Sequence, residues 1–169
     1  MTEFHVADAA VRQLHARYCD AAYRKDYDSF GDCFTEDCEW RIGGAILKGR
    51  SNIVDHAQKV FARFKRIFVT LRTPILDVGD GVASARTYLT EQNVLNDGTS
   101  IHPIGIYFER FVDCGDRWRF KWRLFQTHYV GPADLSGNFY DQPDYGAPPN
   151  MPAFDATTLD VTGSHTRKD

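Results

Sequence analysis

The spacing of apolar residues changes once along the chain, near residue 66, and this change limits the folds that the chain can adopt. Before it, apolar residues recur every three or four positions, which predicts helices over about 8–25, 27–34 and 51–64. After it, β-branched and aromatic residues dominate four extended segments, over 66–78, 82–95, 100–113 and 117–130. Short turn sequences rich in Gly and Asp separate these segments, so we expect neighbouring strands to pair antiparallel.

This order of elements predicts an α+β fold, in which one curved antiparallel sheet wraps around the N-terminal helices. A short hairpin over 39–47 is expected between the second and third helices. The helices are expected to be capped by Asp8, Asp26 and Ser51, whose side chains can accept a hydrogen bond from a first turn. A sheet curled in this way is cone-shaped and leaves a cavity at its open end.

A segment rich in proline follows the last predicted strand. A chain of 169 residues has room for one domain, so we expect a single domain over 1–130 and a tail over 131–169. Aromatic side chains are expected to anchor this tail across the domain or across a neighbouring subunit. They are Phe139, Tyr140, Tyr145 and Phe154.

Charge and hydropathy argue against several classes of protein. The formal net charge of −3 argues against binding nucleic acid or acidic membranes by bulk charge. No apolar run approaches the roughly 18 residues that span a bilayer, so a cytoplasmic protein is expected. The four cysteines form no Cys-x-x-Cys pair and are expected to be buried thiols. We expect neither a metal site nor a cofactor.

Strict alternation in the last predicted strand assigns its side chains to two faces. It places Trp118, Phe120, Trp122 and Leu124 on an apolar face. It places Arg119, Lys121 and Arg123 on a cationic face.

Several short motifs occur in the order and spacing of a known superfamily. They are RYCDAA at 17–22, DYDSF at 26–30, CFTEDCEW at 33–40, KGRSNI at 48–53, GIY at 105–107 and RWRFKWR at 117–123. Over about 8–130 the chain therefore resembles the nuclear transport factor 2-like superfamily, in its polyketide-cyclase (SnoaL-like) branch. The resemblance implies a cone-shaped α+β barrel, a homodimer or homotrimer, and an apolar pocket between the first helix and the concave sheet.

Members of this superfamily differ in function. They include scytalone dehydratase, bile-acid 7α-dehydratase, ketosteroid isomerase, small subunits of ring-hydroxylating dioxygenases and plain binding proteins, so the resemblance alone does not fix an activity. In the dehydratase-like members, a Tyr on the first helix is followed five residues later by an Asp, which works with a His on the first long strand. Here the Tyr matches Tyr18, but the Asp position falls on Tyr23 and the His position on Val69 or Thr70. The chain therefore lacks the Asp–His pair.

Other side chains can supply what dehydration of a hydroxy ketone or isomerisation of an enone needs, namely a proton acceptor and donors to the enolate oxygen. We expect Tyr18 and Tyr23 to donate to a substrate oxygen. His102 is expected to move the proton, because a strand histidine among apolar residues can titrate near neutral pH, and Arg123 is expected to position the oxygen. His56 is expected to lie on a solvated helix face. Substrate contacts are expected from Trp40, Thr70, Tyr107 and His128.

The leading hypothesis is a cofactor-independent lyase or isomerase, in particular a dehydratase, that acts on a hydrophobic polycyclic substrate such as a hydroxysteroid or a polyketide-derived ring. The 12 Phe, 8 Tyr and 3 Trp can line a pocket as well as fill a core. One alternative is a small-molecule binding protein of the same fold, in which the Asp–His pair is absent because no proton moves. Another is a non-catalytic small subunit of a ring-hydroxylating dioxygenase.

Overall fold

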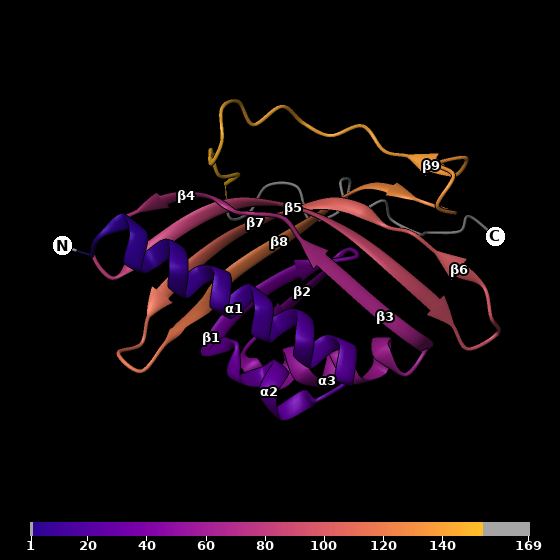
Figure 1. Ribbon diagram of the computed structural model, residues 1–169, viewed down its shortest axis with the longest axis horizontal. Helices are drawn as coiled ribbons and strands as arrows, with labels where there is room; N and C mark the ends of the chain where they lie inside the picture. Colours follow the sequence, from indigo (N-terminus) through magenta and orange to yellow (C-terminus); the bar gives the residue numbers. More distant parts are fainter. Residues whose placement is uncertain (1, 154–169) are drawn as a thin grey trace.

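A strongly curved sheet arches over the first helix in the computed structural model, which describes residues 2–153 (Figure 1). The helices of the described part are α1 (Phe4–Arg24), α2 (Tyr27–Asp32) and α3 (Arg50–Phe61). The strands are β1 (Phe34–Ile42), β2 (Ala45–Lys48), β3 (Phe64–Leu71), β4 (Ile75–Val78), β5 (Val82–Leu95), β6 (Ser100–Ile101), β7 (Ile104–Asp113), β8 (Trp118–Val130) and β9 (Asn138–Phe139). Helix α1 lies under the concave face, while α2 and α3 lie below β1 and β2. The predicted α+β cone is therefore confirmed.

The strands follow the order β2-β1-β8-β7-β5-β3, with β4 and β6 also paired to β5 and β9 paired to β8. Each pair is antiparallel except β1 with β8, which is parallel, so the sheet is mixed rather than wholly antiparallel. Local turn signals did not predict this pair because it joins the two ends of the domain. Two predicted strands are interrupted near prolines, after Leu71 and after Ile101, because proline cannot donate a ladder hydrogen bond.

One of the three predicted helix caps is confirmed. The Asp26 carboxylate accepts a hydrogen bond from the Ser29 backbone N–H at 3.0 Å. Asp8 instead lies inside α1, where it pairs with Arg12 one turn later, because the helix begins four residues earlier than predicted. Ser51 also lies inside its helix, since α3 begins after Gly49, whose φ of 85° suits glycine.

A β-bulge in β8 changes which of its side chains face the helices. The register with β7 shifts by one residue between Phe120 and Trp122, which leaves Lys121 as the extra residue. Phe120 packs in the main core, but Trp122 and Leu124 lie in a second cluster, and Arg123 is fully buried on the inner side. The predicted alternation is therefore wrong beyond Lys121, because a bulge exchanges the two faces of a strand.

The described part of the tail covers the face of the sheet opposite the helices (Figure 1). The second apolar cluster, which we call the convex cluster, consists of Ile106, Phe108, Trp122 and Leu124. Tyr145 and Met151 pack against it, and the Tyr145 hydroxyl accepts a hydrogen bond from Gln126 at 2.5 Å. The Arg86 guanidinium donates to the carbonyl oxygens of Gly146 and Asn150. Phe154, another expected anchor, lies outside the described residues.

None of the described helices is long and apolar enough to cross a membrane. The four cysteines are free thiols. Cys33 and Cys38 are buried as predicted, but Cys114 is exposed because it lies in the turn between β7 and β8.

Candidate functional site

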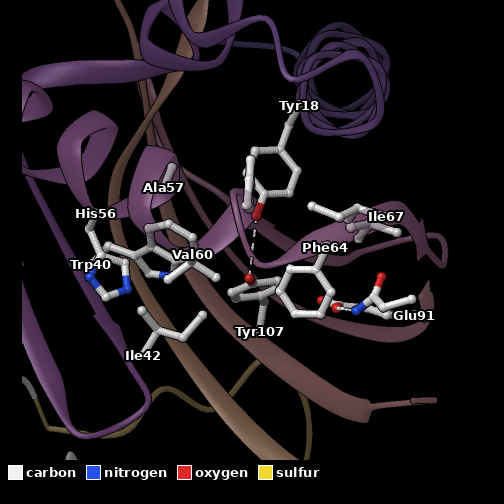
Figure 2. Close-up of a pocket in the computed structure, with 13 residues that line it drawn as sticks. Tyr18, Trp40, Ile42, His56, Ala57, Val60, Phe64, Ile67, Glu91 and Tyr107 are labelled. Carbon is white, nitrogen blue, oxygen red and sulfur yellow. Dashed lines mark hydrogen bonds between the residues drawn. The ribbon is translucent and has the colours of Figure 1, made fainter. Parts of the chain in front are cut away.

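A cavity of about 100 Å³ lies between α1, α3 and the concave face of the sheet (Figure 2). Most of its wall is apolar, from residues Ile42, Ala57, Val60, Phe61, Phe64, Ile67 and Val69. Six side chains bring polar atoms to this wall: Tyr18, Trp40, His56, Glu91, Asn93 and Tyr107. An apolar cavity with a few converging polar groups is the usual form of a small-molecule site.

Two tyrosine hydroxyls meet at the cavity. Tyr18 comes from α1 and Tyr107 from β7, both are buried, and their hydroxyl oxygens lie 3.4 Å apart (Figure 2). This separation is longer than a typical O–H···O hydrogen bond, so both hydroxyls can turn to donate to a third oxygen between them. Burial raises the pKa of both phenols, against the lowering effect of the Arg123 charge. They therefore remain donors at neutral pH.

Arg123 lies behind the two tyrosines and does not line the cavity. Its guanidinium carbon lies 3.7 Å from the centroid of the Tyr107 ring and 4.3 Å from that of Tyr18. A cation over aromatic faces is attracted by the ring quadrupoles. Arg123 therefore supports the tyrosine pair rather than contacting the cavity itself.

Glu109 neutralises this buried cation. Its carboxylate accepts hydrogen bonds from Arg123 Nε at 3.0 Å and Thr87 Oγ1 at 2.7 Å, and it lies 2.9 Å from His15 Nε2. Burial raises the pKa of Glu109, but charge interactions with His15 and Arg123 and these hydrogen bonds outweigh it and lower the pKa to about 2. Glu109 was not among the predicted site residues, although it is the direct register partner of Arg123.

Glu91 is the carboxylate of the cavity. Its Oε2 accepts a hydrogen bond from Asn93 Nδ2 at 2.7 Å, whereas no described residue hydrogen-bonds to its Oε1. Asn93 is itself held by the Phe68 backbone N–H, which donates to its Oδ1. Burial raises the pKa of Glu91 above its ordinary value, against the hydrogen bond from Asn93 and the charge of Arg123. A carboxylate fixed by one oxygen and free at the other is suited to accept a proton.

His56 and Trp40 are the remaining side chains with polar atoms in the cavity wall. His56 is partly buried between Ile53 and Val60 on the inner stripe of α3, so its prediction as a solvated residue is wrong. Burial, together with the charge of Lys59, lowers the pKa of His56. The Nε1 atom of Trp40 is buried and has no hydrogen-bond partner among the described residues.

The structure brings three of the eight predicted site residues to the cavity wall, namely Tyr18, Trp40 and Tyr107. It places Tyr23 elsewhere: this side chain is 52% exposed and packs on Phe68, with ring centroids 4.8 Å apart. Thr70 is exposed, because its neighbour Val69 takes the inward position on β3.

The two strand histidines also lie away from the cavity. His102 stands between β6 and β7, and its backbone N–H donates to the Gly131 carbonyl at 2.7 Å. His128 is the extra residue of a second bulge, where β8 shifts against Gly105 and Ile104. Neither imidazole contributes to the wall. Within residues 2–153, no group of three or more His, Cys, Asp and Glu side chains could hold a metal ion.

Comparison with known proteins identifies a family. A family model described as a SnoaL-like domain matches residues 6–123. A search of curated proteins finds no match.

Solved structures with this fold include several enzymes. A type 2 hexachlorocyclohexane dehydrochlorinase (LinA) has a TM-score of 0.70 at 18% identity, over 82% of this chain and 95% of that chain. A scytalone dehydratase-like protein from Novosphingobium aromaticivorans has a TM-score of 0.72 at 17% identity, over 82% and 96%. An aromatic ring hydroxylase-like protein from the same species has a TM-score of 0.69 at 23% identity, over 73% and 91%. At these identities the likeness shows the fold.

Proposed function

The chain belongs to the SnoaL-like domain family, within the nuclear transport factor 2-like superfamily, and from this premise we propose that it is a cofactor-independent lyase or isomerase that removes a proton next to a ketone. The observation that carries the proposal is the presence of a Glu91 carboxylate and two buried tyrosine hydroxyls in one apolar cavity. Solved structures of the same fold include a hexachlorocyclohexane dehydrochlorinase and a scytalone dehydratase-like protein, whose names denote eliminations, and this supports the proposal.

The ketone oxygen binds between the hydroxyls of Tyr18 and Tyr107. When Glu91 removes the proton on the adjacent carbon, negative charge develops on this oxygen, and both hydroxyls donate to it. One such donor contributes roughly 10²–10³-fold to a rate. Arg123, behind the rings, adds a positive field that favours the same charge.

Glu91 takes the place of the Asp–His pair that the chain lacks. Its raised pKa makes it a stronger base than an exposed carboxylate, and Asn93 keeps it pointed at the cavity. A binding protein would have little use for a carboxylate with a free oxygen in this cavity, because a charged group in an apolar wall weakens the binding of apolar ligands.

The cavity volume supports a substrate with one ring. At about 100 Å³ it is smaller than the 300–1,000 Å³ of clefts for drug-sized ligands. This favours a monocyclic ketone over the polycyclic substrate expected from the sequence.

Two one-ring ketones test the proposal. Isomerisation of 3-cyclohexen-1-one and dehydration of 3-hydroxycyclohexanone both give a conjugated enone, which is followed by its ultraviolet absorbance. We expect turnover of at least one, and a decrease in kcat/KM of roughly 10²–10⁴-fold for Glu91→Gln. Glu36→Gln is the control, since that carboxylate is 80% exposed and remote from the cavity wall. Binding of both ketones without turnover would instead support a binding protein, and full activity of Glu91→Gln would remove Glu91 from the mechanism.

A further inference from the structure

We infer that Trp40 and His56 form a second oxygen subsite in this cavity, which receives a hydroxyl group of the substrate, so that the reaction is a dehydration of a cyclic β-hydroxy ketone. This inference rests on the proposed function and extends it. Neither side chain is needed for the proton removal by Glu91, so each requires another role.

Trp40 presents a donor that the protein leaves unused. The side chain is 3% exposed, it lines the cavity, and its Nε1 has no hydrogen-bond partner among the described residues. Buried donors in native proteins are nearly always paired, so this N–H indicates a ligand acceptor. Trp122 shows the ordinary situation, because its Nε1 donates to Glu39 Oε1 at 3.2 Å.

His56 lies beside Trp40. In Figure 2 the two side chains share one side of the cavity, whereas Glu91 lies on the other side of the Tyr18 and Tyr107 hydroxyls. No described residue hydrogen-bonds to the His56 ring, so its nitrogens can contact a ligand. The wall therefore holds a proton acceptor on one side and a donor pair on the other.

This arrangement matches a substrate with two oxygens on carbons that flank one CH₂ group. With the ketone oxygen at the tyrosine pair, Glu91 takes a proton from the CH₂ carbon, and the electrons of that C–H bond become the new C=C bond. The C–O bond to the hydroxyl breaks and its electron pair leaves with the oxygen, to which Trp40 donates a hydrogen bond. The protonated form of His56, which is the minor form at neutral pH but a stronger acid because the pKa is lowered, gives this oxygen a proton, and it departs as water. Glu91 then releases its proton to solvent and His56 takes one up.

An enone isomerisation needs one oxygen on the substrate, whereas the dehydration needs two. The second subsite can therefore be tested by comparing the affinities of ligands with one and two oxygens. Phenol has one oxygen, whereas resorcinol carries two with the 1,3 spacing of a β-hydroxy ketone. We expect calorimetry to show that the native protein binds resorcinol about tenfold more tightly than phenol, the effect of one additional hydrogen bond. Trp40→Phe should bring the ratio of resorcinol affinity to phenol affinity close to one, while the control Trp122→Phe should keep the tenfold preference.

A second arm uses turnover. His56→Phe keeps a ring in place and removes both nitrogens, so it should lower the ratio of 3-hydroxycyclohexanone dehydration to 3-cyclohexen-1-one isomerisation by at least tenfold. Equal affinities for phenol and resorcinol in the native protein, or an unchanged preference in Trp40→Phe, would overturn the subsite and leave the proposed function standing. If neither phenol nor resorcinol binds, the tyrosine pair is not an oxygen site, and the proposed function falls together with the subsite.

Discussion

At the scale of single residues, the tyrosine pair depends on a buried ion pair that lies out of contact with the cavity. Arg123 and Glu109 are both 0% exposed, and they are joined at 2.9 Å between Nη2 and Oε1. Removing one partner of such a pair leaves an uncompensated buried charge, which costs far more than the pair itself contributes. The pair is thus a strict requirement for the fold around Tyr18 and Tyr107.

We therefore expect Glu109→Gln to lower the free energy of unfolding by roughly 3–5 kcal/mol, as measured by urea denaturation at pH 7. Glu36→Gln, with an exposed carboxylate, should change it by less than about 0.5 kcal/mol. A loss below about 1 kcal/mol for Glu109→Gln would mean that Arg123 finds another partner.

The pH dependence of stability gives the same prediction a second readout. Because the pKa of Glu109 falls from 4.5 to about 2 on folding, its contribution is complete above pH 4.5 and is lost as the pH falls toward about 2. Exposed carboxylates with lowered pKa, such as Asp116, add to the loss in both proteins. The native protein should therefore lose more stability between pH 5 and pH 3 than Glu109→Gln does. Parallel curves would show that Glu109 is not the group that titrates.

Some residues of the cavity could be predicted from the sequence and others were missed, and the positions of individual residues explain the difference. Tyr18 was found because it belongs to a motif on a buried stripe. Tyr23 follows it by five residues, which is about 140° around a helix, so the two could not share one pocket. Glu91 and Asn93 were missed, although they continue the inward alternation of Leu89 on β5, and a polar residue at an inward strand position is the signal that could have found them.

At the scale of secondary-structure elements, pattern and turn signals predicted the kinds of element and their order, but not the faces of β8. A bulge is decided by pairing with β7, and nothing in the local sequence of 117–124 marks it. The bulge at Lys121 is what turns Arg123 inward toward Glu109. The wrong alternation predicted for β8 and the wrong placement of Arg123 on an outer cationic face therefore have one cause, the bulge at Lys121.

This gives a prediction about β8. Deleting Lys121 removes the extra residue and makes Phe120, Trp122 and Arg123 consecutive, so ordinary alternation against β7 still turns Phe120 and Arg123 inward and Trp122 outward. We expect the deletion variant to fold, as judged by near-ultraviolet circular dichroism, and to lose less than the roughly 3 kcal/mol of unfolding free energy that breaking the Arg123–Glu109 pair costs. Lys121→Ala keeps the bulge and removes only a surface contact with Asp37, so it should differ from the native protein by less than about 1 kcal/mol. A deletion variant that loses as much stability as Glu109→Gln would show that the bulge itself, and not the alternation on either side of it, holds Arg123 against Glu109.

At the scale of the whole molecule, the sheet separates two apolar regions with different occupants. The concave side holds the helices and the cavity, and the convex cluster is covered by the described part of the tail. The sequence predicted that the tail has aromatic anchors, but not the face it covers, since the bulge that moves Trp122 and Leu124 outward creates that face. Within residues 131–153 the tail therefore protects the sheet and does not close the cavity.

Substitutions of Tyr145 test whether the convex cluster and the cavity on the concave side are independent. Its ring packs on Phe108 with centroids 4.8 Å apart, and Tyr145→Ala uncovers the convex cluster. We expect it to lower the free energy of unfolding by roughly 1–3 kcal/mol and to increase binding of the dye ANS, because a partly buried aromatic ring is lost. Tyr145→Phe keeps the ring and loses the hydrogen bond from Gln126, so it should lose less than about 1.5 kcal/mol.

Phenol affinity should stay within about twofold in both variants, since the ring lies on the far side of the sheet from Tyr18 and Tyr107. If Tyr145→Ala weakens phenol binding while Tyr145→Phe does not, the packing of the tail reaches the cavity through the strands, and the two sides of the sheet act as one site.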